Sequence, residues 1–110
     1  INNIGSSYEY LGRYKNALDH YLEALKMYEN NNDKAGISTS SNNIGNIYVI
    51  WGNYEKALFY FLKSLKIEEE FNSKSGISIA INNIGIVYHS WKNYDKALKY
   101  YQQGLELERD

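Results

Sequence analysis

The residues with the most usable chemistry are three pairs of asparagines that recur at an interval of 40 residues. They are Asn2-Asn3, Asn42-Asn43 and Asn82-Asn83, and each pair is followed by Ile-Gly. An asparagine amide is both a hydrogen-bond donor and an acceptor. A row of such amides can bond to an extended peptide backbone without reading its side chains. The spacing therefore points to binding.

The other chemically capable residues form no pattern that indicates catalysis or metal binding. His20 and His89 are the only histidines and occupy unmatched positions in the repeat, whereas a metal site needs three or four convergent ligands. The repeated glycines are not followed by Gly-Lys-Ser/Thr, as a phosphate-binding loop requires. No Ser, His and Asp recur in a nucleophilic arrangement. We expect no enzymatic activity, no metal and no cofactor.

The composition narrows the class of partner. The chain carries 12 Lys and Arg against 13 Asp and Glu, a net charge of −1. That balance provides no long-range field to attract nucleic acid or an anionic membrane. No apolar run approaches the roughly 20 residues that span a bilayer. The absence of cysteine excludes disulfides and is compatible with the cytoplasm. We therefore expect a cytoplasmic protein that binds neither nucleic acid nor membrane.

Helices must position the asparagines, because the chain has no proline and its apolar residues recur at helical spacing. Turns are predicted at 11–13, 51–53 and 91–93, and Asp33 and Ser73 are candidate N-caps. The residues expected on apolar helix faces are Ile37, Ile44, Ile47, Tyr48 and Ile50; then Tyr54, Ala57, Leu58, Phe61, Leu62, Leu65 and Ile67; and finally Tyr94, Ala97, Leu98, Tyr101, Leu105 and Leu107.

A glycine recurs inside the first helix of each predicted pair, at Gly5, Gly45 and Gly85. Glycine in a helix costs about 1 kcal/mol relative to alanine, so each of these should have a packing reason. We expect the backbones of two helices to approach closely there. Most tyrosines, and both Trp51 and Trp91, are expected to fill the space between such contacts.

The 40-residue interval predicts an all-α array of antiparallel helix pairs. The whole chain, 1–110, forms a single array, with units at approximately 1–32, 33–72 and 73–110. Ile1 aligns with Ser41 and Ile81 inside the unit. The first unit is therefore expected to lack the front of its first helix, and the chain to be part of a longer protein.

The repeated residues resemble the tetratricopeptide repeat. That signature has an aliphatic-Gly pair with a Tyr three residues later, then a Tyr, an Ala, an aromatic residue and a small residue. The unit departs from the usual 34 residues, and Glu69 and Arg109 replace the family's helix-ending proline. The 40-residue unit is similar to the longer variant of this repeat that is found in bacterial signalling proteins. The matching residues are Ile4-Gly5, Tyr8, Tyr14, Ala17, Tyr21 and Ala24; Ile44-Gly45, Tyr48, Tyr54, Ala57, Phe61 and Ser64; and Ile84-Gly85, Tyr88, Tyr94, Ala97, Tyr101 and Gly104.

The resemblance implies a right-handed α-solenoid that acts as a protein-protein interaction module or scaffold. It places a peptide or protein ligand in a concave groove lined by the first helix of each pair. The implied groove residues are Asn2, Asn3, Ser6 and Glu9; Asn42, Asn43, Asn46 and Val49; and Asn82, Asn83, Ile86 and His89. The absence of Lys and Arg among them disfavours a ligand with an acidic terminus. In the alternative interpretation, one Asn of each pair only bonds neighbouring helices together.

Two other functions stay open at this point. The repeats are also compatible with a sensory or regulatory segment of a larger bacterial signalling protein, a histidine kinase or a transcription regulator. Alternatively, the chain self-assembles into a homo-oligomer, because exposed solenoid ends need to be covered.

Overall fold

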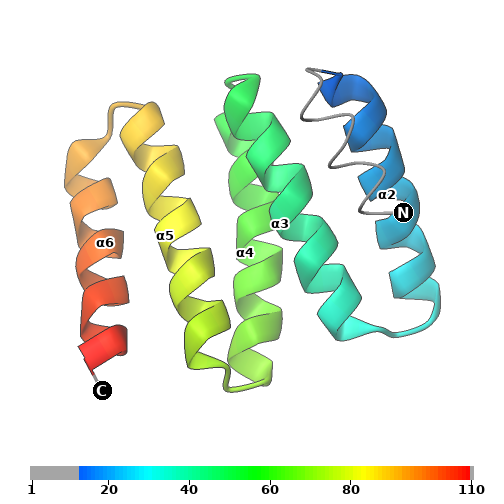
Figure 1. Cartoon of the computed structure of the whole chain (residues 1–110). Coiled ribbons are helices and arrows are strands. Elements are labelled where there is room, and N and C mark those ends of the chain that lie inside the picture. The colour runs from blue at the N-terminus through cyan, green and yellow to red at the C-terminus, as the bar shows by residue number, and fades with distance from the viewer. Residues whose placement is uncertain (1–12, 110) are drawn as a thin grey trace.

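The computed structural model describes residues 13–109, which form α-helices joined by three-residue turns. The helices are α2 (Tyr14–Asn30), α3 (Lys34–Ile50), α4 (Tyr54–Glu70), α5 (Lys74–Ser90) and α6 (Tyr94–Arg109). They lie side by side in chain order, and consecutive helices run in opposite directions (Figure 1). This arrangement confirms the predicted all-α solenoid.

In each turn, one set of three residues both ends the preceding helix and begins the next. Its second residue has a left-handed backbone, with φ between 54° and 75°, at Asn32, Gly52, Asn72 and Lys92. The N–H of the third residue then donates to a carbonyl five residues earlier, for example from Asn53 to Tyr48 at 2.8 Å. This is the Schellman pattern, which satisfies carbonyls left free at a helix end.

The third residue of the turn also caps the following helix. The N–H of Gly36 donates to the Asp33 carboxylate at 3.1 Å, and the N–H of Gly76 donates to the Ser73 hydroxyl at 3.2 Å. Both predicted caps are therefore confirmed. Asn53 does the same for α4, and Asn93 does so for α6. Because one residue closes one helix and caps the next, three residues suffice to reverse the chain.

The repeated glycines make room for aromatic rings, and this corrects the expected contact between helix backbones. A Cβ on Gly45 would lie 2.6 Å from the ring of Phe61, and one on Gly85 would lie 2.7 Å from the ring of Tyr101. Phe61 is only 1% exposed. The glycine therefore forms the hole into which a ring of the partner helix packs.

The described core consists of two clusters, each of which joins the last helix of one unit to the first helix of the next. One cluster joins α2 to α3, and a second joins α4 to α5 through Ala57, Phe61, Ile84 and Val87. Tyrosines outside the repeat signature also pack, since Tyr60 stacks on Tyr48 with ring centroids 5.9 Å apart and Tyr100 stacks on Tyr88 at 5.7 Å.

Several residues predicted on apolar faces are exposed in the structure. Helical periodicity identifies the apolar side of a helix but not how far a neighbour covers it, so residues at the margin were misassigned. On α6, no described helix follows to cover the outer side. The exposed residues are Ile50, Leu62, Tyr94, Leu98 and Leu105.

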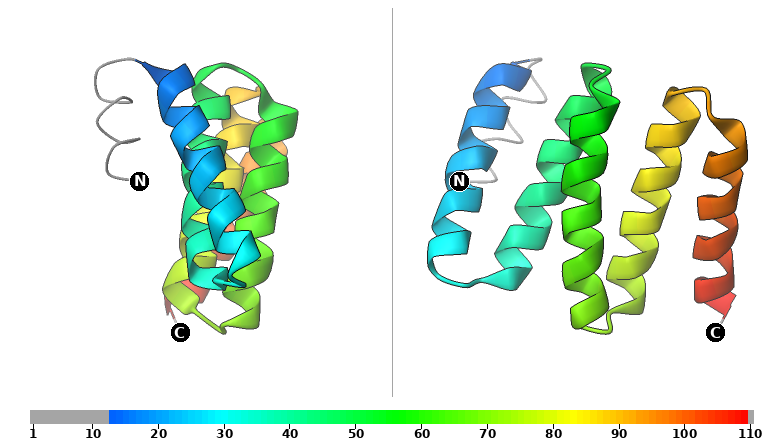
Figure 2. Two further views of the ribbon diagram at one scale, coloured as in Figure 1. Left: turned by 90° about the vertical axis from the view of Figure 1, so that its right-hand side faces the viewer. Right: turned by 180° about the vertical axis from the view of Figure 1, so that it is seen from behind.

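The helices form two layers. α3 and α5 contact each other directly in addition to their sequence neighbours. Viewed along the array, α3 and α4 lie on opposite sides (Figure 2). None of the helices between residues 13 and 109 is long and apolar enough to cross a membrane. The boundaries of the three units stay a prediction, and the front of the first unit lies outside the described residues.

Candidate functional site

The described part of the predicted groove lies on α3 and α5. Asn46, Ile86 and His89 are exposed. The half-buried members are Asn42, Asn43, Val49, Asn82 and Asn83, and Val49 packs against the core cluster between α4 and α5. The remaining predicted residues, Asn2, Asn3, Ser6 and Glu9, lie outside the described residues.

One side of α3 and the matching side of α5 are exposed, and they include residues that the sequence interpretation missed. Thr39, Asn46 and Ile50 lie on one side of α3, and Ile79 and Ile86 lie on the matching side of α5. All five are exposed, and the isoleucines are 51%, 54% and 45% exposed. We call these five residues the α3–α5 face. Thr39 and Ile79 precede Asn46 and Ile86 by seven residues, which is two helical turns, and that spacing could have identified them.

The asparagines beside this face contact neighbouring helices. The Asn83 amide N–H donates to the Asn42 side-chain carbonyl at 3.5 Å, which links α5 to α3. The Asn82 oxygen lies against α6, 3.0 Å from where a Cβ on Gly104 would stand. These are the contacts expected if the asparagines hold helices together. Among the described residues, the Asn42 NH₂ group and the Asn83 carbonyl have no further hydrogen bond, so both keep bonding capacity.

The α3–α5 face lacks charge. α3 and α5 each contain one residue among Asp, Glu, Lys and Arg, the lysine at their first position. In contrast, α2, α4 and α6 carry acidic and basic residues along their length. Apart from these two lysines, the charges of the described helices therefore lie on α2, α4 and α6, and the α3–α5 face offers amide, hydroxyl and isoleucine groups.

The ionisable groups whose pKa is shifted lie away from this face and take part in contacts between helices. Burial raises the pKa of Tyr60 above its ordinary value, with the neighbouring Tyr48 adding to the effect. A hydrogen bond from Lys34, 2.6 Å from the carboxylate, lowers the pKa of Glu70. This pair joins the start of α3 to the end of α4. It is half exposed, so solvent screens it and its contribution to stability is small.

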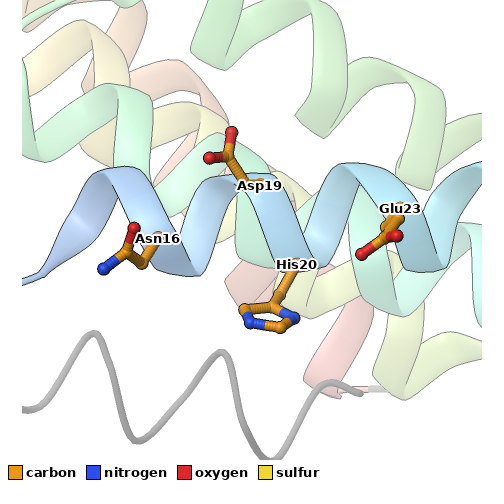
Figure 3. Close-up of a pocket in the computed structure, with 4 residues that line it drawn as sticks. All are labelled: Asn16, Asp19, His20 and Glu23. Carbon is orange, nitrogen blue, oxygen red and sulfur yellow. The ribbon is translucent and has the colours of Figure 1, made fainter.

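A hollow of about 260 Å³ on α2 is lined by four polar side chains, Asn16, Asp19, His20 and Glu23. Figure 3 shows Asp19 and His20 on opposite sides of the ribbon. All four residues belong to one helix, so they do not converge on a point. Within residues 13–109, no three His, Cys, Asp or Glu side chains are grouped so as to hold a metal ion.

Comparison with known proteins agrees with the fold. A family model described as tetratricopeptide repeat matches residues 1–70, and a second with the same description matches residues 78–110. No curated protein matches the chain significantly. Among solved structures, the crystal structure of the TPR domain of Arabidopsis FLU is similar, with a TM-score of 0.88 and 23% identity over 98% of this chain and 92% of that chain. That likeness shows the fold. Because one family model covers well over half of its residues, this chain belongs to the tetratricopeptide repeat family.

Proposed function

We propose that this chain is a protein-interaction module that holds an extended, uncharged peptide segment against the α3–α5 face. Repeats of this family are generally protein-interaction modules and are typically non-catalytic. The peptide as ligand and the α3–α5 face as its site are the specific parts of the proposal.

The observation that carries the proposal is an exposed, uncharged surface that combines isoleucines with amides. Ile79 and Ile86 leave about half of each side chain in water, and burying apolar surface gains roughly 25 cal/mol per Å². Asn46 and the free groups of Asn42 and Asn83 offer hydrogen bonds to a peptide backbone. A charged ligand side chain would lose water here without gaining an opposite charge. The ligand should therefore be apolar and uncharged along the contact.

A peptide-display selection against the full chain tests this proposal. We expect the selected peptides to be depleted in Asp, Glu, Lys and Arg. Ile86→Glu should weaken their binding at least tenfold, or about 1.4 kcal/mol, because it puts a carboxylate on the face. Leu62→Glu is the matched control, since Leu62 is also an exposed apolar residue but lies on α4. Equal binding to both variants would contradict the site.

Self-association is a second candidate function, favoured by the outer side of α6. Tyr94, Leu98 and Leu105 are 56%, 57% and 60% exposed. Their counterparts one unit earlier, Tyr54, Leu58 and Leu65, pack against the core shared by α4 and α5. The side of α6 that matches this contact is therefore uncovered among the described residues.

Light scattering over a range of concentrations checks self-association. We expect the mass to rise with concentration and Leu98→Glu with Leu105→Glu to return the protein to a monomer. The double variant Lys99→Glu and Gln102→Glu places the same number of carboxylates on exposed positions of α6 and should leave the mass unchanged. A strict monomer at high concentration would exclude this function.

A further inference from the structure

We infer that the turn edge of the array holds a second binding site, which takes an organic cation such as an arginine or lysine side chain of a partner. The site is a hollow of about 390 Å³ between the turn after α3 and the turn after α5. Its volume lies at the small end of the roughly 300–1,000 Å³ typical of ligand sites. The residues that line it are Trp51, Gly52, Asn53, Tyr54, Glu55 and Trp91. It contains none of the α3–α5 face residues and does not depend on the function proposed for them.

Three aromatic side chains form the walls of the hollow. Trp51 and Trp91 are 46% and 44% exposed, so their rings remain accessible at the surface. The rings of Tyr54 and Trp91 lie 5.6 Å apart and are tilted by 36°. Trp91 is supported from α5 by Tyr88, whose ring is nearly parallel to it at 6.4 Å. The walls are therefore held in place by their neighbours and still present aromatic surface to a ligand.

The chain already places cations over rings along the same edge. The Lys56 ammonium lies 5.4 Å from the centre of the Tyr48 ring, and the Lys96 ammonium lies 5.2 Å from that of Tyr88. These are distances at which the negative face of an aromatic ring attracts a positive charge. The same chemistry is thus used twice by the chain's own lysines, one unit apart.

No lysine or arginine lines the hollow itself, whereas Glu55 does. Among the described residues Glu55 has no ion pair, since the two ion pairs seen there are Lys34–Glu70 and Lys63–Glu29. A carboxylate beside three aromatic rings favours a cation, disfavours an anion, and makes a neutral apolar ligand costly because Glu55 would lose water without a partner. The chemistry of the walls therefore selects a positively charged group.

The site is particular to this pair of units. Lys15 occupies the position in α2 that Glu55 occupies in α4, and Leu11 occupies the position of Trp51. One unit earlier, the repeat thus supplies a positive charge where the hollow has a negative one.

Tryptophan fluorescence gives a direct test, because Trp51 and Trp91 are the only tryptophans of the chain and both line the hollow. The intact 110-residue protein is titrated with N-acetyl-arginine amide at constant ionic strength, and N-acetyl-citrulline amide serves as the uncharged control of the same shape. We expect a saturable change with the arginine compound, with a dissociation constant in the millimolar range, and none with the citrulline compound. Equal responses to the two would overturn the proposal.

Two matched variants separate the hollow from a general charge effect. Glu55→Gln should weaken arginine binding about threefold to tenfold, because the carboxylate neighbours the bound cation. Asp95→Asn removes the acid at the equivalent position of α6, which does not line the hollow, and should leave binding unchanged. Glu55 is exposed, so the variant should fold normally, and its circular dichroism verifies this. Unchanged binding to Glu55→Gln would also overturn the proposal.

The source of the cation is decided by adding tetramethylammonium chloride and an arginine-containing tetrapeptide to the titrations. Tighter binding of the tetrapeptide than of tetramethylammonium indicates that the site takes a side chain of a partner protein, as we propose. Tighter binding of tetramethylammonium indicates a small quaternary ammonium ligand in place of the side chain and rejects the partner assignment. Binding of neither rejects the cation site altogether.

Discussion

At the scale of single residues, two buried hydroxyls stand out because no group in the described part of the chain forms a hydrogen bond with them. The Oγ atoms of Ser40 and Ser41 are buried and have no hydrogen-bond partner within residues 13–109. By contrast, Ser38 and Ser64 bond to each other at 2.8 Å in the same region. In the third unit, Ala80 replaces Ser40 and is also fully buried. The position therefore tolerates a small apolar side chain and gains nothing from the hydroxyl.

Ser40→Ala should stabilise the protein by about 1 kcal/mol, because an unsatisfied buried hydroxyl carries a desolvation cost of roughly 1–3 kcal/mol and alanine has the higher helix propensity. Urea unfolding followed by circular dichroism measures the change. The reverse substitution, Ala80→Ser, should destabilise by a similar amount. A loss of stability in Ser40→Ala would mean that the hydroxyl has a partner after all.

At the scale of helices, one contact is repeated in the two fully described pairs, α3 with α4 and α5 with α6. The ring of Phe61 on α4 packs onto Gly45 of α3, and the ring of Tyr101 on α6 packs onto Gly85 of α5. Different glycines mark the contacts between consecutive pairs, where Gly36 of α3 faces the ring of Tyr28 on α2. The glycines thus set the distance between helices both within and between units.

Gly45→Ala should destabilise the protein although alanine favours helices. Propensity alone would give a gain of about 1 kcal/mol, but the added Cβ would stand 2.6 Å from the Phe61 ring, and overpacking costs typically 1–3 kcal/mol. The difference between these two terms gives an expected net loss of up to about 2 kcal/mol in chemical denaturation. In a Phe61→Leu background the penalty should shrink, because the ring that the added Cβ would meet is gone. The double-mutant cycle measures this coupling. An equal penalty in both backgrounds would place the strain elsewhere.

What the sequence predicts about the helices depends on how local the cause is. Asp33 and Ser73 were identified as caps because a cap bonds to a residue three positions away. The contact between Gly45 and Phe61 joins residues on different helices, so the sequence indicated that a packing reason existed but not that a ring supplied it. The exposure of Ile79 and Ile50 depends on which neighbours cover a helix, which periodicity does not specify.

At the scale of the whole molecule, the array is a row of helices that are stabilised mainly by contacts with their neighbours. α3 contacts α2, α4 and α5, whereas the main contact of α6 among the described helices is with α5. In such repeat structures the stability is approximately a sum of unit and nearest-neighbour terms.

The interpretation of the chain as a sensory or regulatory segment of a larger signalling protein also concerns the whole molecule, and it stays a prediction.

Native-state hydrogen exchange should therefore be slowest in the inner helices α3, α4 and α5 and faster in α6. Amides that open locally exchange at a rate set by the free energy of opening, and α6 loses fewer contacts when it detaches. Mass spectrometry of peptides from each helix gives the order. Protection of α6 equal to that of α3 would indicate that the array opens only as a whole.

The row of neighbour contacts also determines how the protein bears a pulling force. Apart from the contact between α3 and α5, the main contacts join helices that follow each other along the chain, so a tension applied at the two ends passes through every interface in turn. The interfaces are loaded like springs in series, and the weakest yields first while the others hold. Two partners attached at opposite ends of the array would thus be joined to each other by an extensible tether.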